Sequence, residues 1–164
     1  MVMYDCITDP QAELLRVASL FFVASVHPDL EAGPMGEGPV NLSPKGMTPI
    51  HVLGPNKIAY LDYPGSGNET ARHAAVGGPV ALMVMSMDAS DAAIVRLYGR
   101  ATATPIQESP LADRLLAGAP SPDKARQVVE IEVDKTQTSC GFGVPIYEFV
   151  GERPPEARGH LFRQ

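Results

Sequence analysis

The fold of this chain is decided by two stretches, Val40-Asn41-Leu42-Ser43-Pro44-Lys45-Gly46 and Tyr60-Leu61-Asp62-Tyr63-Pro64-Gly65-Ser66-Gly67-Asn68-Glu69-Thr70-Ala71-Arg72-His73. The first predicts a strand that ends at a lysine. The second predicts a strand, a turn hinged by two glycines and the start of a helix. Backbone N–H groups at a helix start favour an anion, and glycine lets a ligand approach the backbone closely. With Lys45 and Arg72 nearby, the two stretches predict a cradle for one phosphate group, and hence a nucleotide-type cofactor.

Further strands and short helices are predicted on both sides of these stretches. In Gln127–Asp134, for example, apolar residues alternate with acidic ones, which indicates a strand with one buried face. If that strand neighbours Ala93–Ala103, then Arg96 and Arg100 face its acidic residues. The predicted strands are 21–26, 40–43, 50–53, 58–62, 80–87, 93–103 and 127–134, and the predicted helices are 9–19, 68–75 and 109–117.

Mostly short turns join these elements, which indicates a mainly β (α+β) fold, an antiparallel barrel with helical plugs. No βαβ alternation occurs and no GxGxxG motif follows a strand, which argues against a Rossmann fold. At 164 residues the chain predicts one domain over residues 1–150, followed by a polar C-terminal arm over residues 151–164.

Charge and composition argue against several classes of function. The net charge of −6 disfavours a nucleic-acid surface, and no apolar run is long enough to span a membrane. The N-terminus does not resemble a signal peptide, and two distant cysteines predict free thiols in the cytoplasm. The four histidines match no zinc-binding pattern, so no metal site is expected.

Four motifs in order give a specific resemblance. They are the two opening stretches, Val95-Arg96-Leu97-Tyr98-Gly99-Arg100, and Gln137-Thr138-Ser139-Cys140-Gly141-Phe142-Gly143-Val144-Pro145. Together, from Phe21 to about Phe149, the chain resembles the FMN-binding split-barrel superfamily and, within it, the pyridoxamine 5'-phosphate oxidase-like family.

The resemblance implies a six-stranded antiparallel split β-barrel with short flanking helices, which forms a homodimer with FMN at the interface. It implies that the backbone at Asn41 and Leu42 lies along the flavin ring. It implies that a set of polar residues binds the FMN phosphate. It also implies that two further residues contact the flavin from elsewhere in the dimer. The phosphate set is Ser43, Lys45, Ser66, Asn68, Thr70 and Arg72, and the other two residues are Gln137 and Ser139.

Several residues also have a purely structural interpretation. Ser66 and Glu69 fit a capping box, which would turn the Glu69 carboxylate away from a phosphate. Arg72 could pair with Glu69 on the helix surface, and a lysine at a strand end, such as Lys45, is commonly solvated. Asn41 and Ser43 share one face of their strand, which could be the solvated face of an edge strand. No catalytic residue is identified.

The absence of a catalytic constellation in the sequence fits a flavoprotein, because the cofactor carries the hydride chemistry. The first hypothesis is therefore an FMN-dependent oxidoreductase acting on a small organic substrate, with a nicotinamide as one electron source. The alternatives are a non-catalytic flavin-binding protein for storage or sensing, an F420-dependent reductase on the same fold, and a cofactor-free barrel. The C-terminal residues lack the basic, aromatic segment of the vitamin B6 oxidases, so vitamin B6 chemistry is disfavoured.

Overall fold

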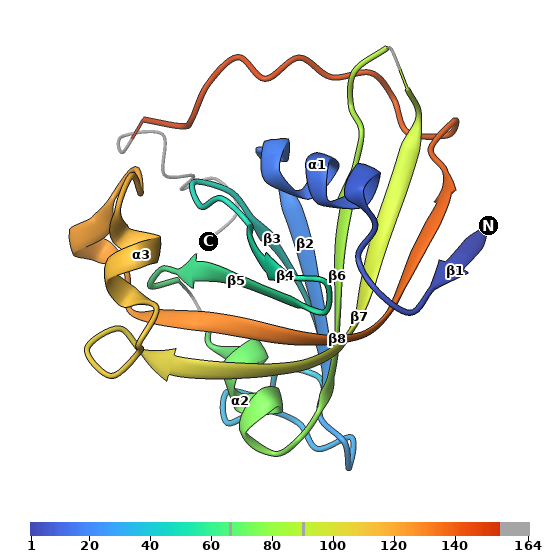
Figure 1. Cartoon of the computed structure of the whole chain (residues 1–164). Helices are drawn as coiled ribbons and strands as arrows, with labels where there is room; N and C mark the ends of the chain where they lie inside the picture. Colours follow the sequence, from blue (N-terminus) through green and yellow to red (C-terminus); the bar gives the residue numbers. More distant parts are fainter. Residues whose placement is uncertain (66, 90, 155–164) are drawn as a thin grey trace.

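The residues that the structure describes form one strongly coiled sheet with three short α-helices (Figure 1). The structure, a computed structural model, describes residues 1–65, 67–89 and 91–154. The strands are β1 (Val2–Tyr4), β2 (Phe21–Val26), β3 (Val40–Lys45), β4 (His51–Gly54), β5 (Lys57–Asp62), β6 (Pro79–Met85), β7 (Ala93–Pro105) and β8 (Gln127–Cys140). The helices are α1 (Asp9–Val17), α2 (Glu69–Ala75) and α3 (Ala112–Leu116), with a 3-10 turn η1 (Pro122–Lys124).

The sheet is antiparallel, as predicted, but it differs from a six-stranded barrel. It has eight strands in the order β3-β2-β6-β7-β8-β5-β4, with β1 paired to β8 beside this path. The path ends at β3 and β4, so the sheet is not closed. The strand β1 escaped prediction because its three residues are all exposed and carry no alternating pattern.

The long pair β7–β8 forms the centre of the sheet and contains a bulge. Tyr98 pairs with Lys135 and Gly99 pairs with Val133, which leaves Asp134 as the extra residue. Before the bulge Val129, Ile131 and Val133 are buried, whereas after it the buried residue is Thr136. A bulge shifts the two-residue period by one position. Because of this shift, the alternation in the sequence stops at Asp134, although the strand itself continues to Cys140.

The main core fills the concave side of the sheet beneath α1. Phe21 and Tyr60 are fully buried there and pack edge to face with ring centroids 5.2 Å apart. Helix α1 contributes Ala12 and Leu15 to the same core. Its N-cap is Thr8, one residue before the predicted Asp9, and the backbone N–H of Thr8 donates to Gln11 Oε1 at 3.0 Å. A smaller core lies under α3, where β5 is buried on both faces.

The convex side of the sheet is only partly covered. In strand β6, Val80, Leu82 and Val84 are buried, whereas Ala81, Met83 and Met85 on the other face are half-exposed. Of the two β7 arginines, Arg100 faces an acidic residue as predicted, whereas Arg96 faces Gln137. Arg96 donates to Ser139 Oγ at 3.1 Å, and Arg100 stands opposite Glu132 but donates to the carbonyl of Gly77. Glu130 and Glu132 of β8 are instead paired with Lys57.

Candidate functional site

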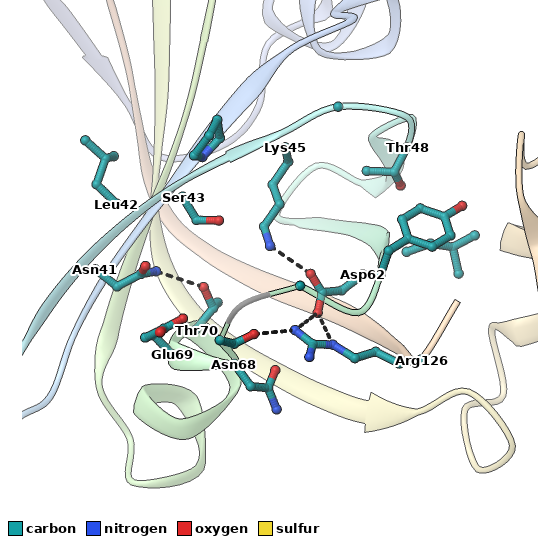
Figure 2. A pocket seen from close by; sticks show the side chains of 16 residues that line it. Asn41, Leu42, Ser43, Lys45, Thr48, Asp62, Asn68, Glu69, Thr70 and Arg126 are labelled. Atoms are coloured by element: carbon teal, nitrogen blue, oxygen red, sulfur yellow. Dashed lines mark hydrogen bonds and ion pairs between the residues drawn. The ribbon is translucent and has the colours of Figure 1, made fainter. Parts of the chain in front are cut away.

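A cavity of about 420 Å³ opens between the end of β3, the end of β5 and the start of α2 (Figure 2). This volume lies in the usual range for small-molecule sites. The two stretches predicted to form a cradle therefore meet in space. They contribute most of the wall, and residue 126 comes from the position just before β8. The polar lining residues are Asn41, Ser43, Lys45, Thr48, Asp62, Asn68, Glu69, Thr70 and Arg126.

Asp62 is the centre of the cavity's polar network, although its side chain is almost fully buried. Its Oδ1 accepts from Lys45 Nζ at 2.8 Å, and its Oδ2 accepts from Arg126 Nε and from Gln127 Nε2, both at 2.8 Å. Burial raises the pKa of this carboxyl, but the hydrogen bonds from Lys45, Gln127 and Arg126 and the charge of Lys45 outweigh it. The pKa of Asp62 therefore lies below its ordinary value, and the group is a carboxylate at neutral pH.

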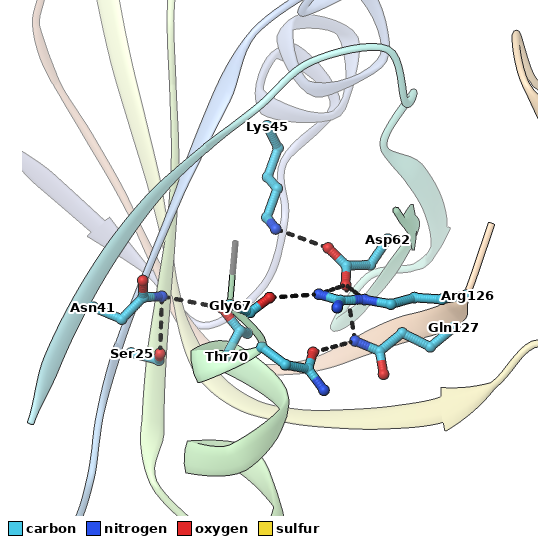
Figure 3. A network of polar contacts seen from close by, with 9 residues as sticks. Ser25, Asn41, Lys45, Asp62, Gly67, Thr70, Arg126 and Gln127 are labelled. Carbon is cyan, nitrogen blue, oxygen red and sulfur yellow. Dashed lines mark hydrogen bonds and ion pairs between the residues drawn. The ribbon is translucent and has the colours of Figure 1, made fainter. Parts of the chain in front are cut away.

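Arg126 and Gln127, where β8 begins, form hydrogen bonds to the glycine-containing turn that follows β5 (Figure 3). Arg126 Nη2 donates to the carbonyl of Gly67 at 3.0 Å, and Gln127 Nε2 donates to Asn68 Oδ1 at 2.8 Å. The backbone N–H of Arg126 also donates to the carbonyl of Asp62. Arg126 thus acts both as the countercharge of Asp62 and as the tether of this turn.

Several donor groups of the cavity remain available to a ligand. Lys45 has three N–H donors and uses one of them on Asp62. Thr48 is 6% exposed, and its Oγ1 has no hydrogen-bond partner within the described residues. A buried hydroxyl without a partner is costly, so Thr48 is a candidate hydrogen-bond partner for a polar ligand in the cavity.

The formal charges that line the cavity cancel. Lys45 and Arg126 supply two positive charges, and Asp62 and Glu69 supply two negative ones. The Glu69 carboxylate lies against Gly67, since a side-chain carbon built on that glycine would collide with it. An anion in this cavity would thus be held by directed hydrogen bonds more than by a net positive field.

Six of the ten residues predicted to bind the cofactor lie together in this cavity: Asn41, Leu42, Ser43, Lys45, Asn68 and Thr70. Asn41 and Ser43 share one face of β3, as predicted, opposite Ser25 and Val23 of β2. Ser66 lies outside the described residues. The predicted helix at residues 68–75 is confirmed as α2, but it has only seven residues.

The other three predicted residues lie elsewhere in this chain. The guanidinium of Arg72 pairs with Glu37, in the loop between β2 and β3, rather than with Glu69. Gln137 accepts from Tyr98 OH at 2.6 Å, and Ser139 accepts from Arg96. Both stand opposite residues of β7, away from the cavity lining.

Three functional candidates were missed by sequence reasoning: Thr48, Asp62 and Arg126. Asp62 stood inside the quoted motif, and a carboxyl beside two predicted cations was a usable signal. Arg126 had no local signal, because its role depends on the pairing of β5 with β8. No group of three or more metal-ligating side chains comes together in the part of the chain that the structure describes. None of the described helices is long and apolar enough to cross a membrane.

Comparison with known proteins places these features in a family context. No protein-family model matches the chain. The chain is 33% identical over 150 residues to the pyridoxamine 5'-phosphate oxidase family protein ustO of Aspergillus flavus. The match covers 90% of this chain but 57% of that protein, so the chain spans little more than half of its relative.

Solved structures share the fold at low sequence identity. A candidate pyridoxamine 5'-phosphate oxidase from Lactobacillus delbrueckii superposes with a TM-score of 0.59 at 22% identity, covering 82% of this chain and 95% of that one. An FMN-binding protein from Syntrophomonas wolfei gives a TM-score of 0.55 at 16% identity, covering 77% and 86%. An FAD- and heme-binding protein from Mycobacterium smegmatis gives 0.52 at 14% identity, covering 89% and 76%. In sequence, this chain is therefore similar to a pyridoxamine 5'-phosphate oxidase family protein, and it shares its fold with a candidate pyridoxamine 5'-phosphate oxidase and an FMN-binding protein.

Proposed function

We propose that this protein binds FMN in the cavity between β3, β5 and α2 and acts as an oxidoreductase on a small organic molecule. The observation that carries the proposal is the cavity itself, where Lys45, Arg126 and the unpaired hydroxyl of Thr48 converge. The similarity to an FMN-binding protein supports it. The exposed free thiols of Cys6 and Cys140 fit the reducing cytoplasm in which we place it.

The residues of the cavity fit the phosphate end of a flavin. Lys45 and Arg126 offer charge-assisted N–H donors, while Ser43, Thr48 and Thr70 offer hydroxyls. Asn68 lines the same end, and we assign Ser66, which precedes it, to the phosphate as well. The strand at Asn41 and Leu42 would then run along the ring. The flavin supplies the hydride chemistry, and the protein holds the ring and excludes water from one side.

We assign a different role to Arg72 than the family resemblance implies. Its guanidinium is held by Glu37, so in this chain it anchors the loop between β2 and β3 to α2. Arg126 takes the place expected for a second cation in the cavity. Gln137 and Ser139 would contact the flavin only from a second copy of the chain.

We also propose that the protein is a homodimer, formed through the convex side of the sheet. Val40 and Leu42 of β3 are 64% and 67% exposed there, and they continue into a half-exposed apolar surface formed by Phe22, Met83 and Ile94. Large exposed apolar surfaces commonly mark interfaces. The convex side lies beside the cavity, because Leu42 also lines the cavity wall.

Val40→Glu should shift the protein from dimer to monomer without unfolding it, because Val40 is already exposed in the single chain. Sedimentation velocity measures the change. The matched control is Val17→Glu, an equally exposed valine on α1, which should leave the dimer intact. A monomeric wild-type protein, or equal behaviour of the two variants, would contradict the proposed interface.

A second candidate function is an F420-dependent reductase. The cancelling charges of the cavity favour it, because a phosphodiester carries one negative charge where the FMN monoester carries up to two. Mass spectrometry of the ligand released from purified protein separates the two cofactors. Bleaching of the bound flavin by NADH or NADPH, followed by reoxidation in air, would argue against the remaining alternative of a storage or sensing protein.

Lys45→Ala should weaken FMN binding by about 1–3 kcal/mol, because it removes a charge-assisted contact to the phosphate. Quenching of flavin fluorescence in an equilibrium titration measures the change in Kd. Lys57→Ala is the matched control, since Lys57 pairs with Glu130 and Glu132 and lines no part of the cavity. Equal affinity of the two variants would show that the phosphate lies elsewhere.

A further inference from the structure

A buried serine and a buried histidine lie directly behind Asn41, outside the cavity. Ser25 is 1% exposed and His73 is 3% exposed, and Ser25 Oγ lies 2.9 Å from His73 Nδ1. Asn41 Nδ2 donates to Ser25 Oγ at 3.3 Å and to Thr70 Oγ1 at 3.2 Å (Figure 3). A hydrogen-bonded chain therefore leads from the cavity wall to a buried imidazole.

The tautomer of the His73 ring sets the direction of this chain. A serine hydroxyl has one proton and two acceptor lone pairs, and Ser25 Oγ accepts a hydrogen bond from Asn41. When the imidazole is neutral with its proton on Nε2, Ser25 donates its own proton to His73 Nδ1. Burial, and after it the charges of His27 and Arg72, lower the pKa of His73, which agrees with a neutral ring.

Protonation of His73 would disturb this arrangement. An Nδ1–H group would donate to Ser25 Oγ, and the serine proton would lose its acceptor. Asn41 can replace that acceptor through Oδ1 if its amide turns over. In the neutral arrangement Oδ1 points away from Ser25 and Thr70 and has no partner within the described residues (Figure 3).

We propose that Ser25 and His73 are positioning residues that hold Asn41 with its amide oxygen toward the cavity, where it accepts a hydrogen bond from an O–H or N–H group of the ligand. The proposal rests on the proposed function for the identity of that ligand. At neutral pH the cavity presents an acceptor at Asn41. Below the pKa of His73 it presents the amide N–H donors instead, and a ligand donor loses its partner.

None of the charged groups around His73 belongs to the hydrogen-bonded chain from Asn41 to the imidazole, so His73 is the titratable group that controls this chain. On its own helix stand Glu69 and Arg72, the latter paired with Glu37. The ring of His27 lies 6.0 Å away, and Arg100 of β7 binds the carbonyl of Gly77 beyond the helix end. Strands β2 and β6, which also pack against α2, contain no titratable residue.

The first test uses the protein without added ligand. Long-range ¹H–¹⁵N NMR at pH 7.5 should show His73 as the neutral tautomer with its proton on Nε2. A proton on Nδ1 at that pH would overturn the proposal. This measurement does not depend on FMN, so it tests the chain of hydrogen bonds even if the proposed function is wrong.

The second test compares FMN affinity at pH 7.5 and at the acidic pH at which the same NMR experiment shows the His73 ring protonated. In His73→Asn, an amide oxygen replaces the Nδ1 acceptor but cannot be protonated. Between these pH values the wild type should lose roughly threefold to tenfold more affinity than this variant, the value of one hydrogen bond. The FMN phosphate also titrates in this range, but equally for both proteins. FMN binding with the same pH profile in both would overturn the proposal.

Two further variants separate His73 from its neighbours. His27→Asn should keep the pH-dependent step and move it to higher pH, because His27 lowers the pKa of His73. Ser25→Ala should abolish the step, and it serves if His73→Asn does not fold. A step that disappears in His27→Asn and persists in Ser25→Ala would contradict the assignment.

Discussion

Asp62→Asn is expected to lower the free energy of unfolding by about 2–3 kcal/mol. Asp62 is 4% exposed and holds two cations, Lys45 and Arg126, whose side chains are themselves mostly buried. Removal of one partner from a buried ion pair leaves uncompensated charge, which typically costs about 3–5 kcal/mol, and partial exposure of the cations reduces this value. Urea unfolding of both proteins measures the difference.

The matched control is Asp5→Asn, because Asp5 pairs with Lys135 on the surface and its side chain is 92% exposed. This variant should change stability by less than about 0.5 kcal/mol. The pH dependence gives a second check. Since the pKa of Asp62 is lowered by folding, its contribution is present above the ordinary carboxyl pKa and is lost as pH falls through the folded value. The gap between wild type and Asp62→Asn should therefore be constant from pH 8 to 5 and close in acid. A gap that widens in acid would contradict this account.

The same variant bears on cofactor binding. Without the carboxylate, Lys45 and Arg126 keep all their donors for an anion, and the net charge of the cavity becomes positive. FMN should then raise the thermal stability of Asp62→Asn more than it raises that of the wild type. This effect would show that Asp62 competes with the phosphate for the two cations.

Gly99→Ala is expected to destabilise the protein by about 3 kcal/mol or more, or to prevent folding. A side-chain carbon at this position would overlap the backbone carbonyl of Glu132, at the bulge where β7 and β8 shift register. A backbone atom in a sheet cannot move aside as a flexible side chain can, so the central strand pair must separate locally. Thermal unfolding followed by circular dichroism measures the loss.

Gly54→Ala is the matched control for this prediction. It also changes a glycine at an irregularity between paired strands, but nothing lies within 4 Å of the added carbon. This variant should keep wild-type stability to within about 1 kcal/mol. Similar losses in both variants would show that close contact at Gly99 is not what requires glycine there.

The elements that the sequence predicted well are those specified by neighbouring residues. The β-favouring residues of Phe21–Val26 gave the bounds of β2, and the sequence from β5 through the glycines into α2 was predicted to within one residue. Both stretches of the cradle also meet in the structure, because the turn after β5 brings α2 against the edge formed by β3. Local pattern was enough for these features.

The features that were missed depend on contacts between distant parts of the chain. Arg126 reaches Asp62 because β8 pairs with β5, and no pattern near residue 126 indicates that pairing. Arg72 turned out to be held by Glu37, in a loop whose path follows no periodic rule. The alternation of buried residues in β8 shifts by one position at Asp134. The bulge that causes the shift can be recognised only once the partner strand is known. When a site lies at the junction of several strands, only some of its residues can therefore be predicted from local sequence.

The most direct test of the account is an equilibrium titration of the cofactor-free protein with FMN and with riboflavin, which lacks the phosphate. If Lys45, Arg126 and Thr48 receive the phosphate, FMN should bind tighter than riboflavin by roughly tenfold or more. Equal affinities for the two flavins, or no binding of either, would contradict the claim that this cavity is a phosphate-anchored flavin site.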